Sequence, residues 1–206
     1  MRCRTRHVLF LSVLSSGLVP TIAATQDLLQ PEPPNFQDDR FADGPRSRQD
    51  HINSSQVASY ERAVSLCDLG WRALLSGEAA TAERYANEAL RLSASLNPAL
   101  LDQGYIVHHS NLILGHVALA RGNKDEARSR LIAAGRTRDS ATLRSFGPNM
   151  SLANALLRQG HVDTVIEFID LCADFWPQEK LSAWRNEVLA GEMPDFGPNL
   201  LYGIPR

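Results

Sequence analysis

Apolar residues recur at three- and four-residue intervals from Ser55 onward. This spacing places apolar side chains on one face of a helix, and it predicts a series of helices. No stretch shows the sustained alternation of apolar and polar residues that is typical of a β-strand. The pattern therefore predicts an all-α protein. The expected helices cover residues 56–76, 78–96, 98–121, 123–138, 149–159, 161–176 and 177–190.

Helix-starting and helix-ending residues stand between these segments. Asn97-Pro98 predicts a helix start, since asparagine caps a helix and proline fits its first turn. Asn123 and Glu126 are spaced as in a capping box, in which each side chain satisfies a free backbone N–H. Glycine favours the left-handed conformation common just after a helix. Three glycines stand where one helix ends and the next begins: Gly77, Gly122 and Gly160.

One set of offsets recurs three times along the helical region. The first frame contains Leu69, Gly70, Gly77, Ala82, Ala86 and Ala89. The second contains Leu114, Gly115, Gly122, Ala127, Leu131 and Ala134. The third contains Leu152, Ala153, Gly160, Val165, Ile169 and Cys172, followed by Pro177. Three matches indicate three copies of a helical hairpin, with small residues where its two helices approach closely.

This pattern resembles the tetratricopeptide repeat, whose helical hairpins stack into a right-handed superhelix. The resemblance covers residues 56–176. It implies an all-α, right-handed solenoid of about three repeats, with 177–190 as a C-terminal capping helix. The stretch from Phe146 to Gly197 also resembles uncharacterised bacterial exported proteins.

The N-terminal segments differ from the helical-repeat domain, which we expect to span residues 55–191. Residues 1–24 have the features of a signal peptide, with three early arginines before an apolar run at 8–19. That run is shorter than the roughly 20 residues that span a bilayer. We therefore expect a periplasmic or secreted protein with no stable membrane span once the leader is removed. Residues 25–54 are rich in proline and charge, which predicts a disordered linker.

Charge and cysteine content narrow the classes of function. Removing the leader takes three of the 21 Lys and Arg and leaves 18 against 23 Asp and Glu. An acidic chain with no basic cluster is a poor match for a phosphate backbone, so we expect no nucleic-acid partner. Cys67 and Cys172 lie several predicted helices apart. This separation predicts two buried thiols rather than a disulfide.

The sequence offers little for catalysis. It contains no Gly-x-Ser-x-Gly, His-Glu-x-x-His or Cys-x-x-Cys motif and no phosphate-binding glycine loop. We therefore expect no enzyme, no catalytic residue and no cofactor. His108, His109 and His116 are the strongest candidates for chemistry.

The separation of His109 and His116 argues against a metal site. Seven residues apart, they share one helix face at a distance of roughly 10.5 Å. Two ligands so far apart cannot hold one metal ion without a third element, so histidines that line a groove or are partly exposed are favoured. A small-ligand or metal-binding protein that uses this pair is the alternative.

The resemblance also implies where a partner binds. In tetratricopeptide proteins the first helix of each hairpin lines a concave face that binds extended peptides or a partner's helix. The matching residues here are Trp71, His109, Leu112, His116, Met150, Asn154 and Arg158. Aromatic residues, arginine and methionine suit recognition of a protein segment. For Trp71, Leu112 and Met150, a position in the core is the alternative.

These observations predict an exported interaction module, an adaptor or assembly factor, with a protein or peptide partner. A structural envelope component is a further alternative.

The tetrapeptide Phe-Gly-Pro-Asn occurs twice, at 146–149 and 196–199. In the first copy, glycine and proline turn the chain and Asn149 caps the next helix. The second copy lies in a C-terminal docking tail, 192–206. Shared turn chemistry is favoured over shared function for the pair. Four tail residues are expected to fold back on the last helices or to occupy the groove: Phe196, Leu200, Leu201 and Tyr202.

Overall fold

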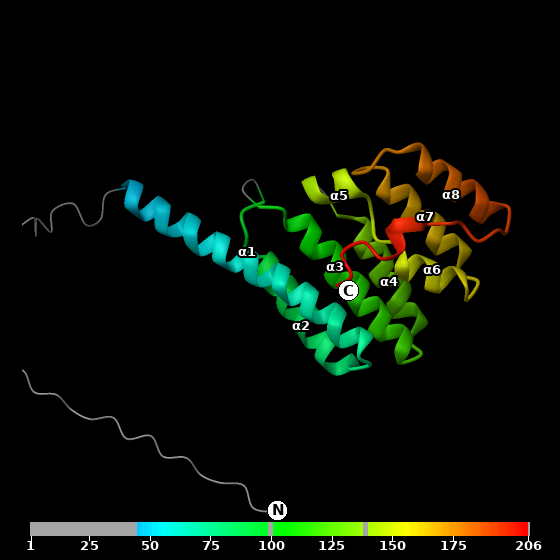
Figure 1. Cartoon of the computed structure of the whole chain (residues 1–206), viewed down its shortest axis with the longest axis horizontal. Coiled ribbons are helices and arrows are strands. Elements are labelled where there is room, and N and C mark those ends of the chain that lie inside the picture. Colours follow the sequence, from blue (N-terminus) through cyan, green and yellow to red (C-terminus); the bar gives the residue numbers. More distant parts are fainter. Residues whose placement is uncertain (1–44, 99–100, 138–139, 206) are drawn as a thin grey trace, which may run out of the picture. The chain divides into compact units, whose positions relative to one another are not determined.

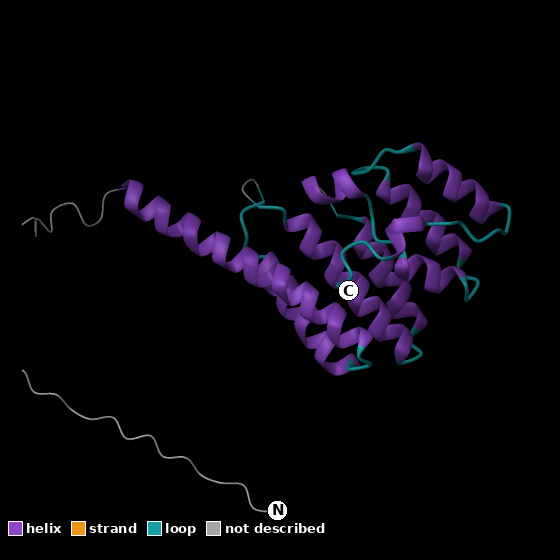
Figure 2. Cartoon of the chain, in the orientation of Figure 1, coloured by secondary structure: helices purple, strands orange, loops and turns teal. Residues whose placement is uncertain are grey.

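The computed structural model describes residues 45–98, 101–137 and 140–205. Every regular element in these ranges is a helix, which confirms the all-α prediction (Figure 2). The elements are α1 (Pro45–Leu75), α2 (Ala79–Ser93), α3 (Gln103–Ala120), α4 (Lys124–Gly135), α5 (Ala141–Phe146), α6 (Ser151–Leu157), α7 (Val162–Cys172), α8 (Glu179–Leu189) and the 3-10 helix η2 (Gly197–Leu200). The predicted signal peptide, 1–24, and most of the predicted linker lie outside the described residues.

The helices pack mainly against their neighbours along the chain. α1 contacts α2 and α3, and α3 contacts α2 and α4. α4 packs against α7, which also contacts α6 and α8 (Figure 1). Each helix thus buries its apolar face against a helix close to it in sequence. None of the helices described is both long and apolar enough to cross a bilayer.

The turns between paired helices follow the predicted backbone chemistry. Three glycines have left-handed φ values, of +78°, +76° and +83°: Gly77, Gly122 and Gly160. At the start of α4, Oδ1 of Asn123 accepts a hydrogen bond from the backbone N–H of Glu126 (3.1 Å). The reciprocal half of the capping box is replaced, because the Asn123 N–H donates to the carbonyl of Ala118 (2.9 Å).

Gly115 lets α3 lie close to two other helices. A Cβ at this position would collide with Cδ2 of Leu152 in α6 and would lie 3.3 Å from Cβ of Arg130 in α4. Gly70 holds the matching place in the first frame, and a Cβ there would lie 3.0 Å from Cδ1 of Ile113 in α3. The small residues of the offset pattern therefore mark close approaches between successive hairpins as well as within one.

The start of α1 differs from the prediction. The helix begins at Pro45 rather than at Gln56, so residues 45–54, the end of the predicted disordered linker, are helical. Proline fits the first helical turn, since its missing N–H would have no partner there. Extending an existing helix also costs less free energy than nucleating a new one. These two effects outweigh the high polarity of the segment.

Two further boundaries were set by caps that the sequence analysis did not identify. α3 begins at Gln103 rather than at Pro98, because Oδ1 of Asp102 accepts a hydrogen bond from the N–H of Tyr105 (3.1 Å). The short helix α5 lies in a range expected to be a loop. The hydroxyl of Ser140 starts it by accepting from an N–H of its first turn (3.0 Å).

α8 packs against α7. It buries an apolar stripe formed by Leu181, Trp184 and Val188. The ring of Trp184 also meets Phe196 of the tail edge to face, with 5.1 Å between ring centroids. The tail thus begins by packing against α8.

Candidate functional site

A cluster of aromatic and histidine side chains joins α1 to α3. Trp71 of α1 is only 2% exposed, and its Nε1–H donates to Nδ1 of His109 in α3 (3.2 Å). The Trp71 ring also lies edge-on against His116, with 5.7 Å between centroids. Because His109 accepts at Nδ1, its neutral ring carries the proton on Nε2.

His109 is fully buried, and the tail lies on it. Burial, with a smaller effect from neighbouring His108, lowers the pKa of His109 well below its usual value, so the ring is neutral. Its Nε2 has no hydrogen-bond partner among the described residues. A Cβ on Gly203 would collide with Cε1 of this ring and lie 2.7 Å from Nε2. The tail therefore covers a buried donor without satisfying it.

His116 connects α3 to α6. Its Nε2 lies 3.0 Å from the hydroxyl oxygen of Ser151, and the tautomer decides which atom donates. Burial lowers the pKa of His116 from 6.5 to about 4, so this side chain is also neutral. It keeps partial exposure to solvent, unlike His109.

His108, to which the sequence analysis gave no separate role, has both ring nitrogens bonded. Its Nε2 accepts from the N–H of Asn149 (3.0 Å), so Nδ1 carries the proton and donates to the carbonyl of Ala134 (3.0 Å). Burial lowers the pKa of His108 to about 4, against the opposing effect of the Ala134 hydrogen bond. This histidine fastens α3 both to α4 and to the first Phe-Gly-Pro-Asn segment.

The two Phe-Gly-Pro-Asn segments lie against each other. Asn199 of the second copy is 5% exposed, and its Nδ2 donates to the carbonyls of Phe146 (3.1 Å) and Pro148 (2.9 Å). Its own carbonyl accepts from the N–H of Met150 (2.8 Å). The second copy therefore closes onto the backbone of the first.

Asn149 makes the corresponding contacts from the first copy. Its Nδ2 donates to the carbonyl of Tyr202 (2.6 Å), and its Oδ1 accepts from the N–H of Ser151 at the start of α6 (2.8 Å). The Tyr202 ring stacks on Phe146, with 5.4 Å between centroids. We call the pair Asn149 and Asn199 the asparagine clasp. It directs the tail, red in Figure 1, past α6 toward α3.

An open and mostly apolar hollow of about 410 Å³ lies beside the clasp. Its most exposed apolar side chains are Leu75 (64%) and Leu201 (61%). We call it the Trp71 hollow. The residues that line it come from α1, α3, α6 and the tail: Trp71, Leu74, Leu75, His116, Ser151, Asn154, Leu200, Leu201 and Ile204.

The predicted groove residues fall into three groups. Those that line the hollow are Trp71, His116 and Asn154. Those that are fully buried are His109, Leu112 and Met150. Arg158 is exposed just after α6 and does not line the hollow. The groove assignment is therefore wrong for Leu112 and Met150. Leu112 is buried because α3 is packed between α1, α2, α4 and α6. Met150 is buried just before α6, where its N–H donates to the carbonyl of Asn199 in the tail.

The predicted tail residues also divide. Leu200 and Leu201 line the Trp71 hollow, whereas Phe196 is buried against α8 and Tyr202 lies on Phe146. The tail thus forms part of the wall of the hollow and leaves space beside it.

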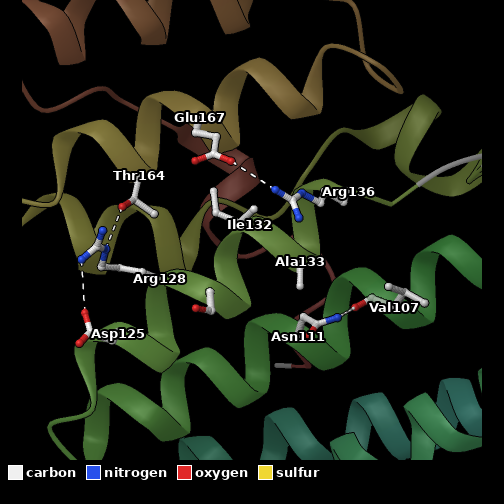
Figure 3. Close-up of a pocket in the computed structure, with 10 residues that line it drawn as sticks. Val107, Asn111, Asp125, Arg128, Ile132, Ala133, Arg136, Thr164 and Glu167 are labelled. Atoms are coloured by element: carbon white, nitrogen blue, oxygen red, sulfur yellow. Dashed lines mark hydrogen bonds and ion pairs between the residues drawn. The ribbon is translucent and has the colours of Figure 1, made fainter.

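A larger hollow of about 650 Å³ lies between α3, α4 and α7. Figure 3 shows that its charged side chains face one another. Arg128 donates to Thr164 (3.1 Å) and pairs with Asp125 (3.3 Å), and Arg136 pairs with Glu167 (3.6 Å). Because these groups already have partners, a ligand would find few free contacts. The Trp71 hollow is the stronger candidate.

Neither a metal centre nor a reactive thiol is found in the part of the chain that is described. No three His, Cys, Asp or Glu side chains come together there to hold a metal ion. Cys67 and Cys172 are free and buried, which confirms the prediction of two separate thiols. Burial raises the pKa of Cys67 to about 12, so its thiol stays protonated.

No family model, no curated protein and no solved structure matches this chain. The Trp71 hollow, the asparagine clasp and the tail are the features of this chain that bear on its function.

Proposed function

We propose that this chain is an exported interaction module, an adaptor or assembly factor, whose Trp71 hollow binds an apolar segment of a partner protein. The observation that carries the proposal is the 64% exposure of Leu75 of α1 in a hollow that Trp71 and Leu74 also line. Apolar side chains gathered in an exposed patch mark interaction sites more often than scattered ones do.

The chemistry of the hollow suits a protein segment. Trp71 supplies an aromatic edge, and His116 and Asn154 supply polar groups that can orient a backbone. Because His116 is neutral, a partner does not have to desolvate a charge there. Fully burying one leucine side chain stabilises an association by roughly 2 kcal/mol. An anchor of this size at Leu75 therefore favours a contact of moderate, reversible affinity.

The placement of the hollow supports the tetratricopeptide-like part of the proposal. It is lined by α1, α3 and α6, which are the first helices of the three predicted hairpins. In helical-repeat proteins the binding surface follows one helix of each repeat. We therefore propose a right-handed solenoid of about three hairpins capped by α8. The features of a signal peptide at 1–24 support the export of the chain.

Site-specific crosslinking in the native compartment tests this function. A photoreactive residue at position 75 should capture a specific partner protein, identified by mass spectrometry. The matched control is position 69, a leucine that is 43% exposed on the same helix and outside the hollow. Leu75→Asp should abolish capture by a probe at Asn154, and Leu69→Asp should leave it intact.

Two results would contradict the proposal. Capture of the same proteins at positions 75 and 69 would mean that the hollow has no special role. A lack of specific capture at either position would favour a structural envelope component.

A small apolar ligand is the second candidate, favoured by the size of the hollow. A volume of about 410 Å³ lies within the range of about 300–1,000 Å³ typical of ligand pockets. Native mass spectrometry of the purified chain would then show an added mass, which Leu75→Asp should remove. The unmodified mass in both proteins would leave the protein segment as the ligand.

A further inference from the structure

The C-terminal tail is buried at its start and only partly buried at its end, where Leu200, Tyr202 and Ile204 pack on the core. Phe196 and Asn199 are 1% and 5% exposed, whereas Leu201 is 61% exposed. Asn199 makes three hydrogen bonds to the first Phe-Gly-Pro-Asn copy and the residue after it. In the described structure, one hydrogen bond joins residues 200–205 to the helical domain, from Asn149 Nδ2 to the carbonyl of Tyr202. We call residues 200–205 the cover.

The cover rests on an unsatisfied donor. Gly203 lies against His109, whose buried Nε2 has no acceptor among the described residues. Buried donors without a partner are costly, and folded proteins keep few of them. Only glycine fits this place, because φ is +72° and a Cβ would meet the imidazole ring. Gly203 therefore packs closely on the His109 ring but leaves its Nε2–H without an acceptor.

The cover also forms part of the wall of the Trp71 hollow. Leu200, Leu201 and Ile204 line it together with Trp71 and Leu74. A protein segment that enters the hollow must pack on the cover or take its place. Taking its place gives access to His109 as well as to the hollow.

We propose that the cover is exchangeable and competes with the partner protein for the Trp71 hollow. The partner supplies an extended, uncharged segment of the same chemistry as Leu200-Leu201-Tyr202-Gly203-Ile204. It places a small residue over His109 and a backbone carbonyl where it accepts from Nε2, which the cover does not do. The asparagine clasp stays closed while the cover moves. This inference rests on the proposed function and adds a competition to it.

Hydrogen exchange on the full chain tests whether the cover opens by itself. The amide of Ile204 bonds within the cover, to the carbonyl of Leu201, and the amide of Met150 bonds to Asn199 in the clasp. We expect the Ile204 amide to exchange at least tenfold faster than the Met150 amide. Equal protection would show that clasp and cover open only together, and it would overturn the proposal.

Two release variants test the competition. Gly203→Ala places a Cβ against His109. Tyr202→Ala removes a ring that packs both on Phe146 and on His109, with 6.0 Å between the Tyr202 and His109 ring centroids. The matched control is Met193→Ala, at a residue that is 46% exposed before the tail docks and outside the hollow. The probe is a fluorescent synthetic peptide of residues 196–206, and its affinity for the full chain is measured by anisotropy.

The tethered cover should compete strongly in the wild-type chain, since a short tether gives an effective concentration in the millimolar range. We expect both release variants to bind the peptide at least tenfold more tightly than the wild type, and Met193→Ala to bind it like the wild type. If neither release variant gains affinity, the cover does not exchange.

Different experimental results would reject the proposed function and the proposed competition. Peptide binding by the release variants, with partner crosslinking unchanged in Leu75→Asp, would support exchange and reject the proposed function. Loss of crosslinking in Leu75→Asp, with no gain of capture in Gly203→Ala, would support the hollow as the binding site and reject the competition.

Discussion

His108 and His109 are neighbours in α3, and both rings are fully buried and neutral, yet their nitrogens have different surroundings. His108 has a partner at each nitrogen, the carbonyl of Ala134 and the N–H of Asn149. His109 has Trp71 at one nitrogen and the backbone of Gly203, without an acceptor, at the other. The hydrogen bonding of His108 is therefore complete, whereas that of His109 is not.

The difference separates a fixed part of the molecule from an exchangeable one. His108 and the asparagine clasp satisfy one another and the backbone around them, so a change at any member leaves a buried group unpaired. His109 lies at the boundary between the core and the cover, where one buried donor is already unpaired. Most buried polar groups in folded proteins have a partner, and each exception needs an explanation. Nε2 of His109 is one of four such atoms in the described residues, and it is the one that lies under the cover.

Matched substitutions at the two histidines should produce the largest contrast. His108→Phe leaves two buried backbone groups unpaired, so we expect a loss of about 3 kcal/mol in the free energy of unfolding. His109→Phe leaves only the Trp71 Nε1–H unpaired and removes the unsatisfied donor, for a loss of about 1 kcal/mol. Urea denaturation followed by circular dichroism measures both. Equal losses would mean that the two rings are energetically equivalent.

Acidification should weaken the fold through the same histidines. Burial lowers the pKa of His108 and of His116 from 6.5 to about 4, and that of His109 in the same direction. Between pH 6.5 and 4 the unfolded chain therefore binds more protons than the folded chain. The stabilisation from these neutral histidines is fully present above pH 6.5, and the free energy of unfolding falls as the pH drops through this window.

The lowered pKa of His108 determines how much this residue alone contributes to the loss of unfolding free energy. Between pH 7 and pH 5 it should account for a loss of about 2 kcal/mol, with a smaller share from the partly exposed His116. Urea denaturation at pH 7, 6 and 5 measures the loss, and His108→Phe should show a shallower dependence on pH. An unfolding free energy that stays constant over this range would show that the rings accept protons in the folded state.

The helices and their turns could be predicted from sequence because their signals are local. Left-handed glycines and the Asn123 cap act within one turn of the chain. The start of α3 was missed for the same kind of reason, since Asp102 competed locally with Asn97-Pro98 and formed the cap. Local chemistry gives the existence of a helix more reliably than its first residue.

The site was less predictable because it depends on long-range contacts. Helical spacing places Leu112 on the same side of α3 as His116, and the repeat resemblance gives Met150 the matching place in the third hairpin, yet both residues are fully buried. The clasp joins residues about 50 positions apart, and no periodicity reports such a contact. Its signal in the sequence was the repeated tetrapeptide, interpreted as two similar turns rather than as two segments that bind each other.

Breaking the clasp should cost less than removing His108. Asn199→Ala removes the donors to the carbonyls of Phe146 and Pro148, and we expect a loss of about 2 kcal/mol. For a chain of this size the loss lowers Tm by roughly 4–8 °C. Asn154→Ala, in the wall of the hollow, is the matched control and should change the stability by less than about 0.5 kcal/mol. A similar loss in both variants would remove the distinction between clasp and hollow.

The smallest effect is expected where the cover meets the protein surface. Phe146 is 61% exposed and stacks on Tyr202, so Phe146→Ala should change the free energy of global unfolding by less than about 0.5 kcal/mol. The same loss of stacking should raise hydrogen exchange at Ile204 by about twofold, because the cover opens without the rest of the fold. Leu189→Ala, at an equally exposed residue of α8, should change neither measurement. If Phe146→Ala instead lowers global stability as much as Asn199→Ala, the cover unfolds together with the clasp. His109 would then lie in the fixed region, and its unpaired nitrogen would be a cost of the fold rather than a place for a partner.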